Sequence, residues 1–235
     1  MCMLPDFFED RLMKPNQHKI LFNNQVFKSK KKWNLEKESI FIQNKFFESG
    51  RSSIFIDKDN FYKLIKTKNF IKSNSKLLRG KSRASDEVLG NYKLRELKLL
   101  VPELRYHGFS FLARDHNEIL IFEKLNNFIT VKSAIKNTND NNYIKDLLFA
   151  VVQQLNLLIR SGVLFRDFHF NNVMVNSKGT LYWVDTSVTI VKNKKEMEYG
   201  INKKIKSLNR QMENERWLCE SNWNFFKQSI ELAID

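Results

Sequence analysis

A long helical pattern followed directly by short β-type runs is the feature that most restricts the fold of this chain. Apolar residues recur at helical spacing through residues 142–161, and Gly162 follows, as a glycine often does where a helix ends. Three short β-type runs then come at 163–165, 173–175 and 181–184, each bounded by polar residues. A chain that carries both kinds of pattern is predicted to be an α+β protein.

The N-terminal half carries further patterns. Residues 41–66 hold three β-prone runs broken at Ser49-Gly50 and at 57–60, which predicts an antiparallel meander with two tight turns. Residues 1–40 are charge-rich without a sustained period, so we expect an irregular or partly helical basic arm. The other expected elements are a basic loop at 67–87, a helix at 88–100, strands at 104–111 and 118–123, and basic helices from about residue 194.

The charge balance points to an anionic partner. The chain has 235 residues with 40 Lys+Arg against 26 Asp+Glu, so its formal net charge is +14. Nucleic acid, a phospholipid surface and an acidic substrate are all compatible with this charge. The segment from Lys28 to Trp33 is a candidate for contact with an anionic membrane surface, and the alternative is a solvated loop of lysines.

Two further observations limit the class of protein. Cys2 and Cys219 are too few for a disulfide framework or a four-cysteine zinc site, so we expect a reducing compartment. The first residues lack the basic-then-apolar order of a signal peptide, and no apolar run approaches the roughly 18 residues that span a bilayer. We therefore expect a cytoplasmic protein that is soluble or peripheral to a membrane.

Three polar residues near the last two β-type runs form a pattern suited to nucleotide chemistry. Asn172 lies five positions after Asp167, and Asp185 lies eighteen positions after Asp167. The runs between them predict a small hairpin that returns Asp185 to the side of Asn172. Oxygen atoms from an Asn and an Asp suit Mg²⁺, which fills its other positions with phosphate and water. Asp167 would accept the proton of an attacking hydroxyl. A structural turn cluster is the alternative.

The stretch from Arg166 to Asp185 resembles the catalytic and metal-binding loops of the protein-kinase-like superfamily, whose pattern is H-R-D-x-x-x-x-N followed by D-F-G. Arg166, Asp167 and Asn172 match in type and spacing, and Asp185 matches the first residue of D-F-G. Phe165 stands in place of the histidine, and Thr186-Ser187 stand in place of the last two residues. His169 gives the form D-x-H-x-x-N, which is similar to that of small-molecule and sugar kinases.

The resemblance implies a two-lobed protein-kinase-like fold, with a basic arm at 1–40, a small β-rich N-lobe at 41–125 and a reduced, mostly helical C-lobe at 126–235. It implies ATP and Mg²⁺ as cofactors. Asn172 and Asp185 would then bind the metal, while Asp167 and His169 would act at the reacting groups. A packed structural histidine is the alternative for His169.

The resemblance also assigns roles in the N-terminal half. Gly50 lies in the turn that would cover the phosphates, and Lys63, with Lys66 as its rival, stands where the superfamily has its phosphate-binding lysine. Glu96 would form an ion pair with that lysine, and the strand that ends near Glu123 would hold the adenine through its backbone. Solvated surface charges are the alternative for Lys63 and Glu96.

Too few residues follow Asp185 for the peptide-docking segment of a protein kinase. The chain resembles bacterial lipopolysaccharide-core kinases of Kdo or heptose through its D-x-H-x-x-N loop, its basic stretch at 78–87, and 205–210 with Trp223. We therefore expect an ATP-dependent phosphotransferase acting on a sugar hydroxyl of the lipopolysaccharide core, or of another acidic glycan, at the inner membrane face. Bacterial kinase-like proteins linked to envelope stress are a second related group. The alternatives are a nucleic-acid-binding basic protein and a regulatory pseudokinase, which Thr186-Ser187 permits.

Overall fold

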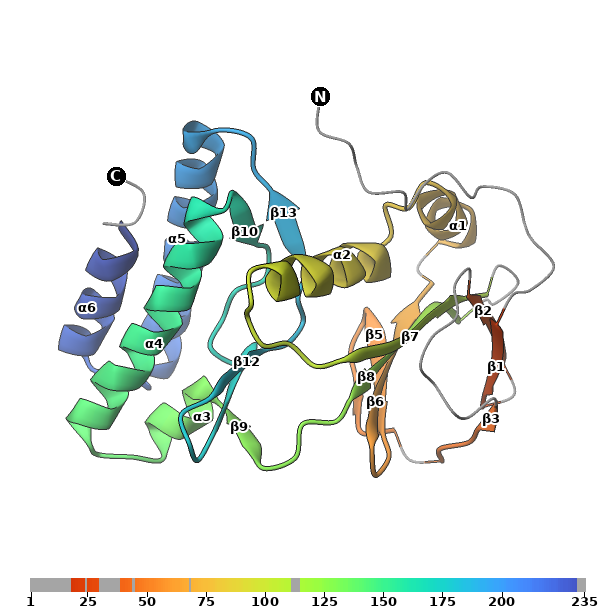
Figure 1. Cartoon of the computed structure of the whole chain (residues 1–235), viewed down its shortest axis with the longest axis horizontal. Helices are drawn as coiled ribbons and strands as arrows, with labels where there is room; N and C mark the ends of the chain where they lie inside the picture. Colours follow the sequence, from red (N-terminus) through yellow and green to blue (C-terminus); the bar gives the residue numbers. More distant parts are fainter. Residues whose placement is uncertain are drawn as a thin grey trace. The chain divides into compact units, whose positions relative to one another are not determined.

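Helices and strands occur together in the protein (Figure 1). The computed structural model describes residues 18–23, 25–29, 39–43, 45–67, 69–110 and 115–231. Of these described residues, 42% are helical and 28% lie in strands, and the largest sheet is curled. The α+β prediction is therefore confirmed.

The chain divides into two compact units, and each is described by itself. The first contains the residues up to Gly80 together with Leu104–Lys124. The second contains Lys81–Glu103 together with Leu125–Asp235. Lys81–Glu103 thus groups with the C-terminal residues, although it precedes the boundary at residue 125 that the resemblance implies.

The first unit is built on an eight-stranded sheet with the strand order β3-β1-β2-β7-β8-β6-β5-β4. Its strands are β1 (His18–Phe22), β2 (Gln25–Ser29), β3 (Ser39–Ile40), β4 (Phe47–Glu48), β5 (Ser52–Ile56), β6 (Asn60–Lys66), β7 (Leu104–Phe109) and β8 (His116–Glu123). β3 runs parallel to β1, and the other neighbouring pairs are antiparallel. The predicted meander corresponds to β4, β5 and β6, and the two later predicted strands are β7 and β8. These predictions are confirmed.

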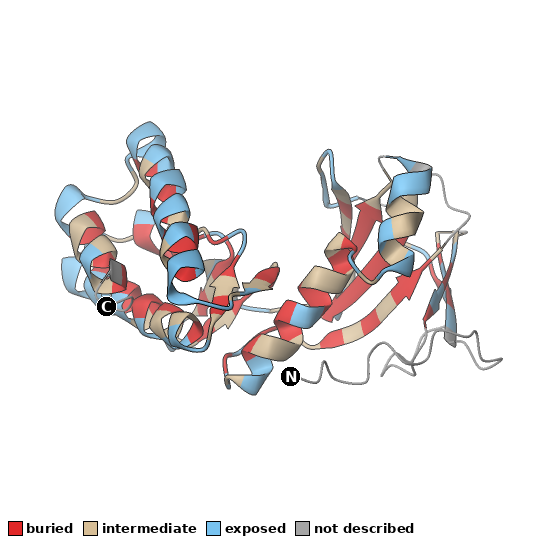
Figure 2. Cartoon of the chain, turned by 90° about the horizontal axis from the view of Figure 1, so that it is seen from above, coloured by how far each residue is buried: buried red, intermediate tan, exposed pale blue. Residues whose placement is uncertain are grey.

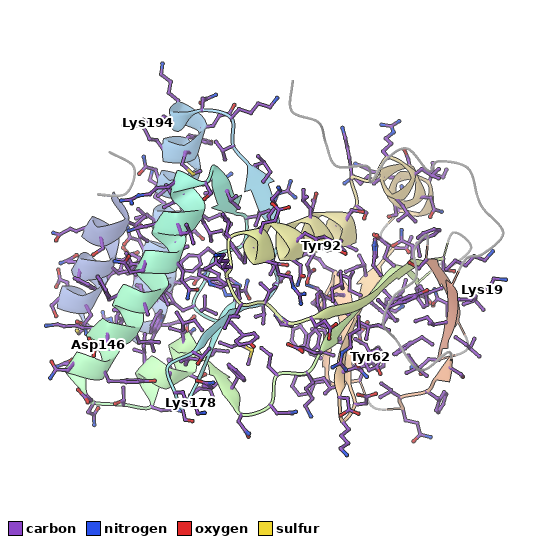
Figure 3. All side chains as sticks on the ribbon, viewed as in Figure 1. Lys19, Tyr62, Tyr92, Asp146, Lys178 and Lys194 are labelled. Carbon is purple, nitrogen blue, oxygen red and sulfur yellow. The ribbon has the colours of Figure 1, made fainter. Side chains whose placement is uncertain are left out.

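The curl of this sheet lets β1 share a core with β5 and β6. The ring centroid of Phe22 lies 5.3 Å from that of Phe55 and 5.2 Å from that of Tyr62. Tyr62, labelled in Figure 3, is fully buried and donates a hydrogen bond from its hydroxyl to Oδ2 of Asp57 at 2.6 Å. Ile20, Phe27, Ile40, Leu64, Tyr106, Ile119 and Ile121 complete this cluster of buried residues. Figure 2 shows the buried residues along these strands in red.

Strands at 18–29 and 39–40 correct the expectation of an irregular or partly helical arm at 1–40. β1 and β2 pair so that Phe22 lies opposite Gln25, and the turn between these strands begins at Asn23. Asn23 in this turn has a φ of 43°, a conformation that asparagine adopts more readily than most residues. Five-residue strands contain too few alternations to stand out in a charge-rich segment. Residues 1–17 and 30–38, and with them most of the Lys28–Trp33 cluster, lie outside the described residues.

Two helices also occur where the sequence predicted a loop at residues 67–87. α1 (Phe70–Leu78) lies in the stretch that we expected to be a loop, and Asn69 caps it by accepting a hydrogen bond from the Lys72 N–H. α2 (Arg83–Glu96) begins before the predicted start at residue 88. Ser82 caps α2 through a hydrogen bond from the Ser85 N–H, so the polar residues after Ser82 form its first turn.

The second unit is mainly helical. Besides α2 it contains α3 (Val131–Lys136), α4 (Asn141–Arg160), α5 (Lys194–Glu215) and α6 (Glu220–Glu231), with strands β9 (Phe128–Thr130), β10 (Val163–Phe165), β11 (Val173–Asn176), β12 (Leu181–Trp183) and β13 (Val188–Ile190). β9, β11 and β12 form one small sheet, and β10 pairs with β13. The predicted long helix, the three β-type runs and the C-terminal helices are confirmed as α4, β10, β11, β12, α5 and α6.

One hydrophobic core holds the second unit together. Apolar residues of α4 pack in it with Trp183 of β12 and with Phe226 of α6, both of which are fully buried. Gly162 follows α4 with a φ of +70°, a conformation that glycine adopts without steric cost, and its N–H donates to the Ile159 carbonyl at 3.0 Å. No helix among the described residues is long and apolar enough to cross a membrane.

Candidate active site

The β11–β12 hairpin positions Asn172 and Asp185. Val173 lies opposite Trp183 in this antiparallel pair, as the hairpin prediction requires. Lys178, labelled in Figure 3, lies in the turn, where Oδ1 of Asn176 accepts hydrogen bonds from the N–H groups of Lys178 and Thr180 at 3.0 and 2.9 Å. The residues that flank the hairpin are therefore held side by side at its open end.

Three hydrogen bonds fix Asn172 at this end, one of them from its own N–H to the His169 carbonyl at 2.8 Å. The Nδ2 amide of Asn172 donates to the backbone carbonyl of Asp167 at 2.8 Å. The Val184 N–H donates to the backbone carbonyl of Asn172 at 2.9 Å, which brings Asp185, the next residue, close to Asn172 along the chain. With Nδ2 engaged, Oδ1 is the side-chain atom of Asn172 that could coordinate a cation.

Asp185 has an unusual backbone conformation. Its φ is 53°, in the left-handed region that few residues other than glycine adopt, although aspartate is enriched among them. The Ser187 N–H donates to the Asp185 carbonyl at 2.8 Å, and the Ser187 carbonyl accepts from the Arg166 N–H at 2.9 Å. Sparsely populated backbone conformations persist where surrounding contacts enforce them, and they are frequent at functional sites.

Helix α2 packs closely on the segment after Asp185. The Thr186 hydroxyl donates to the Glu87 carbonyl at 2.9 Å, and both residues are buried. Gly90 approaches so closely that a Cβ atom at this position would lie 1.5 Å from the Thr186 carbonyl oxygen. A side chain is therefore excluded at Gly90 unless the backbone moves.

The carboxylate of Asp167 is accessible and lies near a cation. Its side chain is 54% exposed, and its Oδ2 lies 3.9 Å from Nη2 of Arg83 in α2. The side chain of Arg166 is engaged elsewhere, in an ion pair with Asp86 and in a hydrogen bond from Nε to Thr189 Oγ1 at 2.9 Å. An exposed carboxylate that is held only loosely is suited to accept a proton from a bound hydroxyl.

His169 has a buried ring nitrogen without a partner. Its Nδ1 atom is buried and has no hydrogen-bond partner among the described residues. Burial is the main influence on the ring and lowers its pKa, while the charges of Asp167 and Asp185 act in the opposite direction. The imidazole is therefore neutral at pH 7. A buried nitrogen of this kind is expected to find a partner when a ligand binds.

The donor atoms near Asp185 suit Mg²⁺ better than a transition metal. No group of three His, Cys, Asp or Glu side chains with the geometry of a metal site occurs in the part of the chain that the structure describes. Mg²⁺ needs only one or two protein oxygen ligands when phosphate and water supply the rest. The Asp185 carboxylate and Oδ1 of Asn172 are two such oxygens, so the residues present fit this cation.

In the first unit, the two candidate lysines have different environments. Lys63, in the middle of β6, is 6% exposed and lies opposite Ile54 and Leu120. Lys66, at the end of β6, forms an ion pair with the exposed carboxylate of Glu48. Lysine side chains are rarely buried to this extent, so the position of Lys63 is the more unusual one.

The turn at Gly50 has few backbone donors left for a phosphate. Oγ of Ser49 accepts hydrogen bonds from the N–H groups of Arg51 and Ser52 at 3.1 and 3.0 Å. The Ser49 N–H donates to the Ser52 carbonyl at 2.9 Å. Three N–H groups of the turn are thus satisfied within it. The phosphate role of Gly50 stays a prediction without support from this geometry.

Glu96 and Glu123 lie at the ends of their elements. Glu96 is exposed and forms an ion pair with Lys93 at 2.6 Å on the same helix. Glu123 ends β8 opposite Asn60, and the chain enters the second unit after the next residue, Lys124. The ion pair of Glu96 with the phosphate-binding lysine stays a prediction, as does the contact of the strand ending at Glu123 with adenine.

Two residues near the site were not singled out from the sequence. Arg83 approaches Asp167, and Glu87 is a carboxylate residue that is only 2% exposed. Both lie on α2, far in sequence from the loop. The available signal was Gly90, because a glycine inside a helical pattern often marks a close approach of another segment.

Comparison with protein-family models and with curated proteins gives no match to this sequence.

Proposed function

We propose that this protein is an ATP-dependent phosphotransferase with a two-lobed, protein-kinase-like architecture, which phosphorylates a sugar hydroxyl of the lipopolysaccharide core at the inner face of the bacterial inner membrane. The observation that carries the proposal is the pair of hydrogen bonds that hold Asn172 to Asp167 and to Val184, the residue before Asp185. These bonds gather a candidate proton acceptor and two candidate Mg²⁺ ligands at one place, as phosphoryl transfer requires.

On this proposal, Oδ1 of Asn172 and the carboxylate of Asp185 hold Mg²⁺. When bound, the cation neutralises charge on the phosphate oxygens of ATP. The accessible carboxylate of Asp167 orients the acceptor hydroxyl and takes its proton. Nδ1 of His169 donates a hydrogen bond to a ligand oxygen, which gives this buried nitrogen a partner that the described residues do not supply.

Lys63 is assigned to the α- and β-phosphates of ATP in preference to Lys66. Lys63 is buried in the middle of β6, which sets it apart from a solvated surface lysine. Lys66 lies at the end of β6 and forms an ion pair with Glu48. Glu96 keeps its proposed role as the carboxylate that orients Lys63; it is exposed and paired with Lys93 on its own helix.

The charge of the chain supports an acidic acceptor. A net charge of +14 attracts anionic ligands over a range set by the ionic strength. An acidic glycan of the lipopolysaccharide core has this property. Beside Asp167, Arg83 is a cation positioned to attract such an acceptor toward the loop.

Nucleotide binding provides the first test. ATP should raise the melting temperature of the wild-type protein in the presence of Mg²⁺, and a chelator should abolish the increase. Asp185→Asn should lose most of this increase because it removes the charged metal ligand. Asp167→Asn should retain it, because Asp167 acts on the acceptor.

Asp146→Asn serves as the matched control for both variants. Asp146, labelled in Figure 3, is an exposed aspartate of α4 outside the site. This control should respond to Mg²⁺ and ATP as the wild type does. An Asp185→Asn protein with an unchanged Mg²⁺-dependent response would overturn the metal assignment.

A further inference from the structure

Helix α1 carries exposed aliphatic side chains beside exposed lysines. Ile71 is 80% exposed and Leu78 is 68% exposed. They are seven positions apart, close to two helical turns, so they lie on the same side of α1. Lys72 and Lys76, which are also exposed, are four positions apart and occupy a neighbouring side. None of the side chains described in α1 is buried, as the blue and tan colouring of this helix in Figure 2 shows.

The surrounding sequence is basic without interruption. Residues 60–85 contain no Asp or Glu, while the same stretch holds eight Lys and Arg. Asp59 and Asp86 are the acidic residues that bound it. More than half of the net charge of +14 is therefore concentrated in this one stretch. Within it, Lys72, Lys76 and Arg79 all belong to α1 or its C-terminal cap, and all three are exposed.

A helix of this length needs a surface to lie on. α1 has nine residues, and isolated helices shorter than about 12–15 residues are marginal in water. Most helices gain their stability by covering an apolar stripe, but Ile71 and Leu78 face solvent. A partner that covers these two side chains and attracts lysines would stabilise α1.

We propose that α1 is an interfacial helix that binds an anionic phospholipid surface. Ile71 and Leu78 enter the boundary between headgroups and acyl chains, while Lys72, Lys76 and Arg79 contact lipid phosphates. The positive charge of α1 favours an anionic partner. Nucleic acid would use only the cationic side chains, through its phosphates, whereas a lipid surface also takes up the exposed aliphatic side chains. These residues differ from those of the Lys28–Trp33 cluster, and the proposal does not depend on the proposed activity.

Vesicle binding without nucleotide tests this surface on the full chain. The wild-type protein should co-sediment with vesicles that contain about one part phosphatidylglycerol in three, and it should bind pure phosphatidylcholine vesicles much more weakly. Lys72→Gln with Lys76→Gln should weaken binding to the anionic vesicles by about 30-fold, because each lysine near such a surface contributes about 1 kcal/mol.

A second pair of substitutions tests insertion of the aliphatic side chains. Ile71→Ser with Leu78→Ser should weaken binding to the same vesicles by about tenfold, since two partly inserted aliphatic groups are lost. The matched control is Phe149→Ser with Leu157→Ser on α4, where the two side chains are 52% and 40% exposed. This control should bind the vesicles as the wild type does.

A charge-matched control makes the lysine result specific. Lys195→Gln with Lys206→Gln removes the same charge from exposed positions of α5 and should weaken binding far less than the α1 pair. Equal losses in the two lysine pairs would overturn the role of α1. Unchanged binding by the Ile71/Leu78 variant, or no binding of the wild type to anionic vesicles, would also overturn it.

Vesicle binding by α1 can be tested separately from the proposed phosphotransferase activity. The Asp185→Asn variant should bind anionic vesicles as the wild type does, whatever its effect on ATP. Loss of lipid binding in the α1 variants with an intact response to Mg²⁺ and ATP would therefore separate the two sites. If the α1 lysines were instead needed only for binding a fluorescent RNA, and not vesicles, the lipid surface would be excluded.

Discussion

The hydroxyl of Thr186 donates a hydrogen bond to the backbone carbonyl of Glu87 at 2.9 Å, and both residues are buried. This bond ties helix α2 to the segment that follows Asp185. The hydroxyl of Thr186 therefore fixes the backbone next to Asp185, the candidate metal ligand.

Thr186→Val should destabilise the second unit by about 1 kcal/mol, because valine keeps the shape of threonine but cannot donate the hydrogen bond. Urea unfolding followed by tryptophan fluorescence measures this loss, since Trp183, Trp217 and Trp223 all belong to this unit. Thr186→Ser retains the hydroxyl and should unfold at a higher urea concentration than Thr186→Val. Equal stability of the two variants would show that the hydrogen bond contributes nothing measurable.

Gly90→Ala should destabilise the protein by at least about 2 kcal/mol, although alanine normally favours a helix over glycine. The new Cβ would lie 1.5 Å from the Thr186 carbonyl oxygen, so α2 or the segment after Asp185 must shift. We expect the shift to weaken the Mg²⁺-dependent response to ATP as well. Gly50→Ala is the control for stability, because nothing lies within 4 Å of a Cβ at that position. A Gly90→Ala protein as stable as wild type would contradict the close approach.

Substitution of the two candidate lysines should separate their roles. Lys63→Met should raise the dissociation constant for ATP about tenfold or more, since it removes a charged donor to the phosphates. Lys66→Met should leave ATP affinity nearly unchanged, because its ammonium group pairs with Glu48 at the end of β6. Isothermal titration calorimetry in the presence of Mg²⁺ gives both values. A larger increase in the dissociation constant for ATP in Lys66→Met than in Lys63→Met would assign the phosphates to Lys66.

His116 should make the first unit sensitive to acid. Its Nε2 lies 3.0 Å from Oγ of Ser53, and burial lowers its pKa from the ordinary value of 6.5, with Asp115 acting in the opposite direction. As the pH falls below about 6.5, the unfolded chain binds a proton at His116 while the folded protein does not, so the free energy of unfolding decreases. Above this pH the ring is neutral in both states, and His116 contributes no pH dependence.

His116→Gln should flatten the pH dependence of stability below about pH 6.5, because glutamine does not titrate. Urea unfolding at several pH values between neutral and mildly acidic measures the slope. A variant whose free energy of unfolding falls as steeply as that of the wild type would show that other groups cause the acid sensitivity.

The elements that could be predicted from the sequence are those with strong local signals. α4 repeats its apolar residues over several turns and is followed by Gly162, whereas β11 and β12 enclose a polar turn with Gly179 at a φ of +78°. The same local signal predicted that Asn172 and Asp185 flank this hairpin, with Asp167 five positions before Asn172. Each of these features depends on residues near one another in the chain.

The features that the sequence did not reveal depend on capping or on distant contacts. α1 begins at a single polar cap, Asn69, and has no long apolar stripe to identify it. β2 pairs with β7 through Lys28 and Phe109, a contact that no local pattern specifies. Likewise, Arg83 and Glu87 join the site only because α2 packs on the loop, and chain position alone does not predict that packing.

Transfer of phosphate is the most direct measurement of the proposed function. Wild-type protein, γ-labelled ATP and Mg²⁺ should be incubated with intact and deacylated lipopolysaccharide cores, with Asp167→Asn, Asp185→Asn and the Asp146→Asn control in parallel. We predict label on the glycan with the wild type and with Asp146→Asn, and a loss of about 100-fold or more with the two site variants. Equal transfer by Asp167→Asn and wild type, or no label on any core with a wild-type protein that binds Mg²⁺ and ATP, would contradict a lipopolysaccharide-core kinase centred on Asp167.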